Sequence, residues 1–207
     1  MSKQPPNPPS PDDLGNLIEG KDGPSAPGGE TQADRHFGMR IGRDGTWYYL
    51  GTPIKRMPLV KLFSTVLRRD DKGDFWLITP VERGRIDVDD APFVAVGLMV
   101  DGEGQDARLT FRTNLDEEIV ADAEHPIRVV VDPDTEEPTP YIHVRDNLEA
   151  LIARPVFYDL AEMAEEATVG DDIELRVWSG GNMFRFGNAG PGECFESRNC
   201  DRTSEVS

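Results

Sequence analysis

The stretch Ile78–Phe93 constrains the fold most, because the charge of the chain changes sign within it. Residues 35–85 carry 11 Lys and Arg and 5 Asp and Glu, whereas residues 86–207 carry 9 and 28. The stretch reads ITPVERGRIDVDDAPF, with its charged side chains set in an apolar frame. Two interpretations stay open: the charges cluster by chance on one solvated protein, or a basic module meets an acidic one at this joint.

The formal net charge of -17 makes binding to other polyanions unfavourable. Nucleic acids and anionic membranes would repel the protein as a whole, so we predict neither as a partner. The N-terminus lacks the apolar run typical of a signal peptide. The longest near-unbroken apolar run, Ala91–Val100, is about half of what a spanning helix needs. The sequence therefore predicts a soluble, cytoplasmic protein.

Both ends of the chain are predicted to be disordered tails, residues 1–35 and 188–207. The first is rich in Pro, Gly, Ser and acidic residues, and it buries too little apolar surface to offset the entropy of ordering. The second is polar and holds the two cysteines, Cys194 and Cys200. Because no further Cys or His ligands stand at zinc spacing, we expect two free thiols in a reducing compartment.

Residues 36–84 predict an N-terminal ββαβ-like module. Asp44-Gly45, between Met39–Arg43 and Thr46–Leu50, is a strong signal for a two-residue hairpin turn. Asp74–Thr79 reads as the last strand of the module. Between them, apolar residues at helical spacing predict one amphipathic helix over residues 58–69, with its stripe at Leu59, Leu62, Phe63, Val66 and Leu67.

Residues 85–187 predict a larger β-rich module with one helix, a barrel or roll for which a pleckstrin-homology-like domain is one option. Apolar spacing over Leu148–Glu166 indicates that helix, which Pro155 either kinks or divides. The fold class is therefore α+β, with two small modules and disordered tails. The alternative is one pleckstrin-homology-like barrel of the strands from about 74 to 145, closed by this helix. The predicted strands are Arg85–Val88, Phe93–Val100, Arg108–Thr113, Glu118–Ala121, Ile127–Asp132, Pro140–Arg145, Ile173–Trp178 and Met183–Phe186.

The two predicted helices resemble each other at an offset of 97 residues. Pro58 aligns with Pro155, and Phe63 aligns with Leu160. Either the chain holds a β-β-α-β duplication, or any two amphipathic helices would match equally well at this spacing.

Polar side chains inside apolar strands, or at their ends, suggest a binding site between the modules. Arg groups in such places either lock a carboxylate in a structural pair or receive an anionic ligand. If a ligand exists, an anionic small molecule or an acidic peptide fits Arg groups beside aromatic rings. We expect Glu82, Arg83 and Asp90 to fix one module against the other, with any cleft beside them. The candidate residues are Trp47, Tyr49, Arg56, Glu82, Arg83, Asp90, Arg112, Thr113, Asn114, Arg128, Arg145 and Trp178.

Catalytic and metal motifs are few in this sequence. The three histidines form no HxxxH, HExxH or HxH pair, so we predict no metal site, no cofactor and no catalytic residue. The alternative is a hydrolytic or metal-dependent enzyme that combines Asp87, Asp89 and Asp90 with His125 or His143.

Six runs of the chain resemble domain-of-unknown-function family 1285, an uncharacterised bacterial family. They are MRIGRDGTWYYLGTPIKR, LVKLFSTVLRR, FWLITPVERGRIDVDDAPF, LTFRTN, HPIRVVVD and PYIHVR, in consistent order from Phe37 to Phe186. The resemblance implies a two-module α+β protein with a suggested part in signal transduction or ligand sensing. It brings no catalytic residue to this chain, and it favours a noncatalytic binding module. A further alternative is a scaffold that holds an acidic protein partner through its tails and through Arg68 and Arg69.

Overall fold

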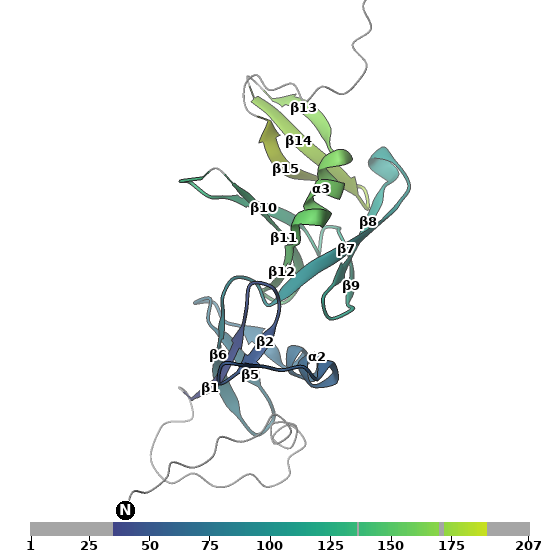
Figure 1. The fold of residues 1–207 in the computed structure, drawn as a ribbon. Coiled ribbons are helices and arrows are strands. Elements are labelled where there is room, and N and C mark those ends of the chain that lie inside the picture. Colours follow the sequence, from purple (N-terminus) through teal and green to yellow (C-terminus); the bar gives the residue numbers. More distant parts are fainter. Residues whose placement is uncertain (1–34, 136, 170–171, 190–207) are drawn as a thin grey trace, which may run out of the picture.

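The structure, a computed structural model, describes residues 35–135, 137–169 and 172–189. Most of both predicted tails, with both cysteines, lies outside these ranges. The described chain forms two strand-rich domains stacked end to end, and a small third sheet lies at the far end of the second domain (Figure 1). It is an α+β fold of two domains. None of the described helices is long and apolar enough to cross a membrane.

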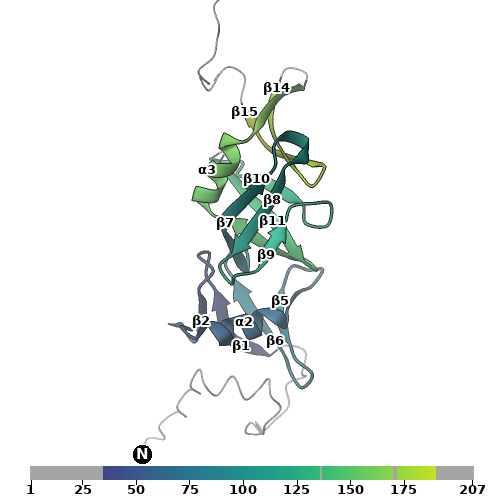
Figure 2. The ribbon, with the colours of Figure 1, turned by 90° about the vertical axis from the view of Figure 1, so that its right-hand side faces the viewer.

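The first domain is a six-stranded sheet with one helix. Its strand order is β3-β2-β1-β6-β5-β4, in which β1 and β6 are parallel and the other neighbours are antiparallel. Helix α2 (Met57–Thr65) joins β3 to β4 and lies across one face of the sheet, where Phe63 stacks on Trp47 (Figure 2). The strands are β1 (His36–Ile41), β2 (Trp47–Tyr49), β3 (Thr52–Pro53), β4 (Leu67–Arg69), β5 (Phe75–Ile78) and β6 (Arg83–Val88).

The second domain is also built on a six-stranded sheet, curved into a half-barrel. Its order is β10-β11-β12-β7-β8-β9, with β12 and β7 parallel. A short 3-10 turn, η1 (Gly104–Asp106), follows β7, and helix α3 (Arg154–Glu162) follows β12. The strands are β7 (Phe93–Asp101), β8 (Arg108–Thr113), β9 (Glu118–Val120), β10 (Ile127–Val131), β11 (Pro138–Arg145) and β12 (Leu148–Ile152).

The two six-stranded sheets have the same topology. Numbered within each domain, the strands lie in the order 3-2-1-6-5-4, with the first and sixth parallel at the centre. The helices do not follow this correspondence: α2 lies between the third and fourth strands, whereas α3 comes after the sixth. The two helices begin 97 residues apart, at Met57 and Arg154, which is the offset predicted from the sequence. The repeat in the structure is instead the shared strand order of the two sheets, and it does not include the helices.

The third sheet consists of β13 (Glu165–Val169), β14 (Asp172–Ser179) and β15 (Asn182–Ala189), all antiparallel. The buried Ser179 fixes it to the second domain, because its Oγ donates to the Ala121 carbonyl at 2.7 Å and accepts from the Leu109 N–H at 2.9 Å. Phe186 of β15 stacks on Phe157 of α3 at 4.6 Å between ring centroids.

The helix predicted over Leu148–Glu166 is wrong at both ends. Residues 148–152 form strand β12, because Leu148, Ala150 and Ile152 alternate toward the core with the period of a strand. Helix α3 begins only at Arg154, with Pro155 in its first turn, and Glu165–Val169 is again a strand. Pro155 therefore marks the start of a helix, where its missing N–H costs nothing.

Three further predictions differ from the structure. The strand predicted at Arg85–Val88 lies in the first sheet as part of β6, because Ile86 pairs opposite Phe75 and is buried there. Since β5 and β6 both belong to the first sheet, a single barrel that starts near residue 74 is wrong. The predicted end of the first helix is strand β4 instead, where Leu67 lies opposite Leu77.

Candidate functional site

Ion pairs join the two domains beside the apolar cluster that runs through both. The first domain presents cations from α2 and β4, and the second presents carboxylates from two hairpin turns. Lys61 Nζ lies 2.8 Å from Asp116 Oδ2, and Arg68 Nε lies 3.8 Å from Asp146 Oδ2. Asp116 (φ 62°) and Asp146 (φ 50°) both adopt the left-handed conformation, which Asp tolerates better than most side chains. The turn geometry thus sets carboxylates against the basic segment.

Arg145 links the two domains more tightly than these pairs do. Its Nη1 donates to both oxygens of Glu117, at 2.7 and 2.8 Å, and its Nη2 donates to the Ser64 carbonyl at the end of α2 at 2.9 Å. The guanidinium also lies over the Phe93 ring, 5.2 Å from the centroid. Arg145 therefore acts as a structural connector, which is the first of the two interpretations considered for the Arg set.

Asn114 makes a second link, through its amide. The Val94 N–H donates to Asn114 Oδ1 at 3.0 Å, and Asn114 Nδ2 donates to the Gly45 carbonyl of the first domain at 3.2 Å. Gly45 has a φ of 78° and is buried against this amide, so a Cβ there would overlap Asn114 Nδ2. The β1–β2 hairpin turn thus docks on the second domain through its backbone.

Asp90 lies in the connection between β6 and β7 and is bound from both sides. Tyr141 donates its hydroxyl to Asp90 Oδ1 at 2.7 Å, and Arg43 Nε lies 3.1 Å from Asp90 Oδ2. Burial, and then the bond to the Asp90 carboxylate, raise the pKa of Tyr141 to about 12. Asp90 thus joins the domains as predicted.

The same prediction is wrong for Glu82 and Arg83, whose contacts lie within the first domain. Glu82 pairs with Arg35 at 3.1 Å, and Arg83 lies over the Trp76 ring at 4.1 Å. Glu82 precedes β6 and Arg83 is its first residue, so both lie at the opposite end of β6 from its connection to the second domain.

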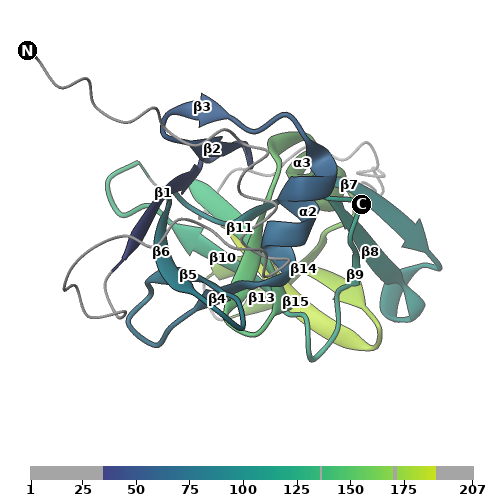
Figure 3. The ribbon, with the colours of Figure 1, turned by 90° about the horizontal axis from the view of Figure 1, so that it is seen from below.

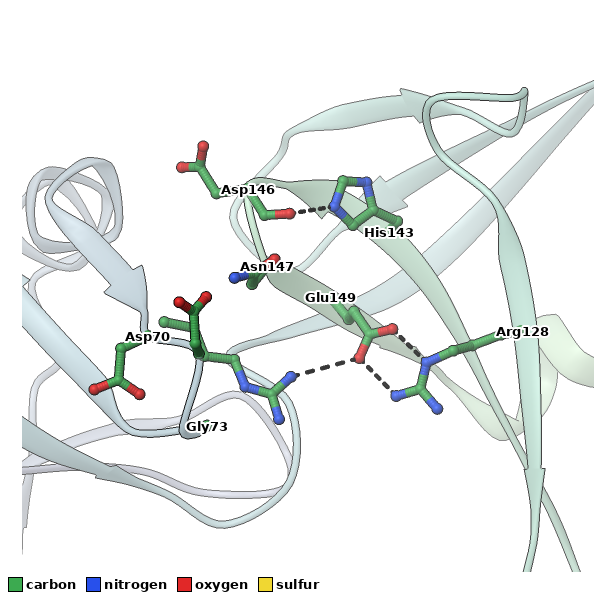
Figure 4. A pocket seen from close by; sticks show the side chains of 9 residues that line it. Asp70, Gly73, Arg128, His143, Asp146, Asn147 and Glu149 are labelled. Atoms are coloured by element: carbon green, nitrogen blue, oxygen red, sulfur yellow. Dashed lines mark hydrogen bonds and ion pairs between the residues drawn. The ribbon is translucent and has the colours of Figure 1, made fainter.

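An open cleft of about 540 Å³ lies between the β4–β5 turn of the first domain and strands β10–β12 of the second (Figure 4). Its size falls within the roughly 300–1,000 Å³ of small-molecule sites. Apart from Gly73, its lining residues have polar or charged side chains. The lining residues are Arg69, Asp70, Asp71, Gly73, Arg128, His143, Asp146, Asn147 and Glu149.

Glu149 is the central carboxylate of the cleft, and two guanidinium groups approach it. Arg128 binds it with two bonds, one from Nε to Oε1 and one of 2.6 Å from Nη2 to Oε2. Arg69 Nη1 comes from the first domain and lies 3.9 Å from Glu149 Oε2. Figure 4 shows the two bonds from Arg128 to the Glu149 carboxylate. Hydrogen bonding to Glu149 raises the pKa of Arg128 further above its ordinary value.

Three side chains of the cleft have unused hydrogen-bonding capacity. Within the described ranges, Asp71 and the Asn147 amide have no hydrogen-bond or ion-pair partner, and Arg69 has only its long contact with Glu149. Asp70 differs from them, because it accepts from the Trp76 indole at 2.9 Å and from two backbone N–H groups. These bonds, led by that of Trp76, lower the pKa of Asp70. Arg69, Asp71 and Asn147 are the groups that a ligand would meet.

His143 holds one wall of the cleft in place. Its Nδ1 lies 2.9 Å from the Glu124 carbonyl oxygen, and its Nε2 lies 2.5 Å from the Asp146 carbonyl oxygen. Which of the two nitrogens donates depends on the tautomer of the ring. The ring thereby connects the 121–126 loop with the β11–β12 turn.

A second hollow, of about 420 Å³, lies beside α2 on the other side of Asp146. Its cations are Lys61, Arg68 and Arg145, and each is already bound: to Asp116, to the Leu67 carbonyl and to Glu117. This hollow is therefore the outer surface of the inter-domain ion pairs.

The predicted site residues divide into three groups. Asp90, Asn114, Arg128 and Arg145 lie at the joint, but among them the cleft wall includes only Arg128. Trp47, Tyr49 and Thr113 belong to the packed interior, where Thr113 Oγ1 accepts from the N–H groups of its own turn. The remaining residues lie elsewhere: Arg56 at the start of α2, Arg112 beside Asp116 at 3.6 Å, Glu82 and Arg83 in the first domain, and Trp178 beside Glu165 in the third sheet.

Sequence reasoning missed Arg69, Asp71 and Asn147 as cleft residues. Arg69 is the last residue of the helix predicted over residues 58–69, and no prediction singles out Asp71. Asn147 follows Asp146 in a polar turn between two apolar strands, so the turn itself was visible in the sequence. That these two turns face each other depends on how the domains are stacked.

The structure does not bring the predicted acid and histidine sets together. Asp87 lies 3.3 Å from His36 Nε2, and Asp89 pairs with Arg40, so both face β1. His125 and His143 lie near each other in the second domain, with 6.1 Å between ring centroids. Among the described residues, no group of three His, Cys, Asp or Glu is arranged to hold a metal ion.

The chain belongs to the DUF1285 family. Residues 30–91 match the model of its N-terminal domain, described as a domain of unknown function, and residues 92–186 match its C-terminal domain. The border between the matches falls in the connection from β6 to β7. This family assignment confirms the resemblance found in the sequence.

Solved structures of two other family members are similar to this chain. A DUF1285 family protein from Silicibacter pomeroyi DSS-3 is 46% identical, with 76% of this chain and 82% of that chain covered and a TM-score of 0.68. A DUF1285 family protein from Shewanella baltica OS155 is 24% identical, covers 64% of this chain and 94% of its own, and has a TM-score of 0.49. A search of functionally curated proteins finds no match.

Proposed function

We propose that this member of the DUF1285 family is a noncatalytic binding module that receives an anionic group in the cleft between its domains. The observation that carries the proposal is the Arg69 guanidinium. It lines the cleft, it is 37% exposed, and its nearest carboxylate oxygen is 3.9 Å away. A guanidinium carries five N–H donors, so Arg69 has donors to offer to a ligand.

The pairing of Glu149 with Arg128 leaves the charge of Arg69 available to an anion. Arg128 neutralises Glu149 with two bonds, so among these three side chains Arg69 contributes one positive charge in excess. Aromatic rings support both guanidinium groups: Phe75 lies under Arg69 at 5.3 Å, and Tyr141 lies under Arg128 at 4.5 Å. The rings beside these guanidinium groups are therefore Phe75 and Tyr141. The rings predicted from the sequence were Trp47, Tyr49 and Trp178.

We further propose that ligand binding in this cleft serves signal transduction. A ligand that bridges Arg69 of the first domain and Arg128 or Asn147 of the second would bind one arrangement of the domains better than others. Binding would then shift the population of that arrangement, which is the physical basis of a signal. A pleckstrin-homology-like second domain also stays a prediction. The curved sheet followed by α3 is compatible with it.

The test is anion binding measured by amide chemical shifts, with glutarate and inorganic phosphate as probes. We expect saturable shifts at Arg69 and Asn147, and a loss of at least about tenfold in affinity for Arg69→Gln. Arg154→Gln is the matched control, because Arg154 is 71% exposed and pairs with Glu137 outside the cleft. Unchanged affinity in Arg69→Gln, or no saturable shift at the cleft with either probe, would overturn the proposal.

The two alternatives stay predictions. An enzyme that uses Asp87, Asp89 and Asp90 would need these carboxylates near His125 or His143, and their described contacts are with other groups. A scaffold for an acidic protein would use Arg68 and Arg69, which here face the carboxylates of the chain's own second domain.

A further inference from the structure

We infer that the ligand of the inter-domain cleft is a zwitterion, with an amine in addition to its anionic group. The inference deepens the proposed function and rests on it. Its basis is the charge of the cleft walls, where the carboxylates of Asp70, Asp71, Asp146 and Glu149 outnumber the guanidinium groups of Arg69 and Arg128.

Two of these four carboxylates are already satisfied. Asp70 accepts from the Trp76 indole and the backbone N–H groups of Lys72 and Asp74. Glu149 accepts two bonds from Arg128. Because these carboxylates already have hydrogen-bond donors, a further cation would gain little from binding to either of them.

The other two carboxylates have little or no compensation. Asp71 is exposed and has no ion-pair or hydrogen-bond partner in the described part of the chain, and Asp146 has only Arg68, at 3.8 Å. Asp71 is two residues from Arg69, in the turn that follows β4. A simple anion bound at Arg69 would therefore sit near unneutralised negative charge.

An ammonium group removes this repulsion and uses the free acceptors. It carries three N–H donors, which suit the Asp71 carboxylate and the Asn147 side-chain oxygen. The anionic group of the same molecule takes the donors of Arg69 and the Asn147 amide nitrogen. The cleft thus offers one cationic and one anionic position, as free amino acids and short peptides require.

The test compares molecules that share a carbon skeleton. Two zwitterions of different length, glycine and 4-aminobutanoate, are titrated beside acetate and butanoate as anions and butylamine as a cation. Affinities come from amide shifts of the full chain. We expect at least one zwitterion to bind about tenfold more tightly than its matched anion.

Two variants assign the positions. Arg69→Gln weakens both anion and zwitterion, whereas Asp71→Asn removes the preference for the zwitterion and leaves the affinity for the anion unchanged or higher. Asp106→Asn is the control, since Asp106 is exposed in η1 and outside the cleft. All three side chains are surface groups, so the variants are expected to fold.

Each outcome decides the inference. If anions bind in an Arg69-dependent manner and neither zwitterion binds more tightly, the inference fails while the proposed function stands. If the preference persists in Asp71→Asn, the assignment of the amine position fails. If nothing binds at the cleft, both proposals fail together.

Discussion

In the first domain helix α2 joins the third strand to the fourth, whereas in the second domain residues 121–126 join β9 to β10 without a helix. Both sheets nevertheless have the same strand order with a parallel pair at the centre. Figure 3 shows the two domains along their common axis, with α2 in the foreground. The two domains therefore share a sheet and differ in the connection between the third and fourth strands.

The shared sheet supplies the cores, and the connections supply the chemistry of the joint. The connection through α2 brings Lys61, Arg68 and Arg69 to the second domain. The hairpin turns of the second domain place Asp116 and Asp146 opposite Lys61 and Arg68. A helix inserted at one connection therefore determines which side of the joint is basic.

The largest effect should come from breaking the core of the first domain. Trp47 is buried and stacks on Phe63, so Trp47→Ala should lower the free energy of unfolding by about 3–5 kcal/mol. The buried apolar residues of both domains form one continuous cluster. We therefore expect amide protection, measured by hydrogen exchange, to fall in both domains.

A loss of protection confined to the first domain would show that the two sheets unfold independently. Tyr158→Ala is the control for the loss of an aromatic ring, because Tyr158 is exposed on α3. It should change the free energy of unfolding by less than about 0.5 kcal/mol.

A smaller effect should come from the docking of the β1–β2 turn. Gly45→Ala forces an L residue into a φ of 78° and places a Cβ against Asn114, so it should cost about 1–3 kcal/mol in chemical denaturation. Gly51→Ala has a matching φ of 80° and meets no heavy atom within 4 Å. The difference between the two variants measures the contact between the domains. Equal losses would mean that only backbone strain matters.

The smallest effect concerns the ion pair between α2 and the β8–β9 turn. A hydrogen bond from Lys61, then its charge, lower the pKa of Asp116 below 3.8. Because the folded pKa is depressed, the contribution to stability is present above pH 3.8 and is lost as the pH falls through the folded value. Lys61→Met should raise the pKa of Asp116 toward 3.8, as followed by carboxyl NMR titration.

Asp132 provides the internal control for this titration. Its pKa is also lowered, but by the N–H groups of Asp134 and Thr135 in its own turn. It should titrate alike with and without Lys61. A shift of both groups in Lys61→Met would point to a change of the whole structure.

The local elements could be predicted from the sequence where the signal is short-range. The strand Arg108–Thr113 appears as predicted, because period-two alternation is a property of neighbouring residues. A hairpin also forms around Asp44-Gly45, but Ile41 pairs with Trp47, so its turn is longer than the predicted two residues. Residues 148–152 show the limit. Five residues with apolar side chains at 148, 151 and 152 fit a helix as well as a strand, and pairing with β7 and β11 decides for the strand.

The site could be predicted only in part for the same reason. The change of charge sign at Ile78–Phe93 indicated a joint between a basic and an acidic module, and Asp90 and Arg128 are at that joint. No local pattern marks Arg69 as a cleft residue. Its partner, Glu149, lies 80 positions further along the chain, and only the fold brings the two together.

By itself, the sequence determined the two-module α+β class, the family, and the opposite charges of the two modules, since composition and local periodicity carry that information. Only the tertiary structure decided that β1 pairs with β6 and β7 with β12, and that Arg69, Asp71 and Asn147 face one cleft. These are contacts between residues far apart in the chain. They are fixed by the packing of whole sheets, which the pattern of neighbouring residues does not contain.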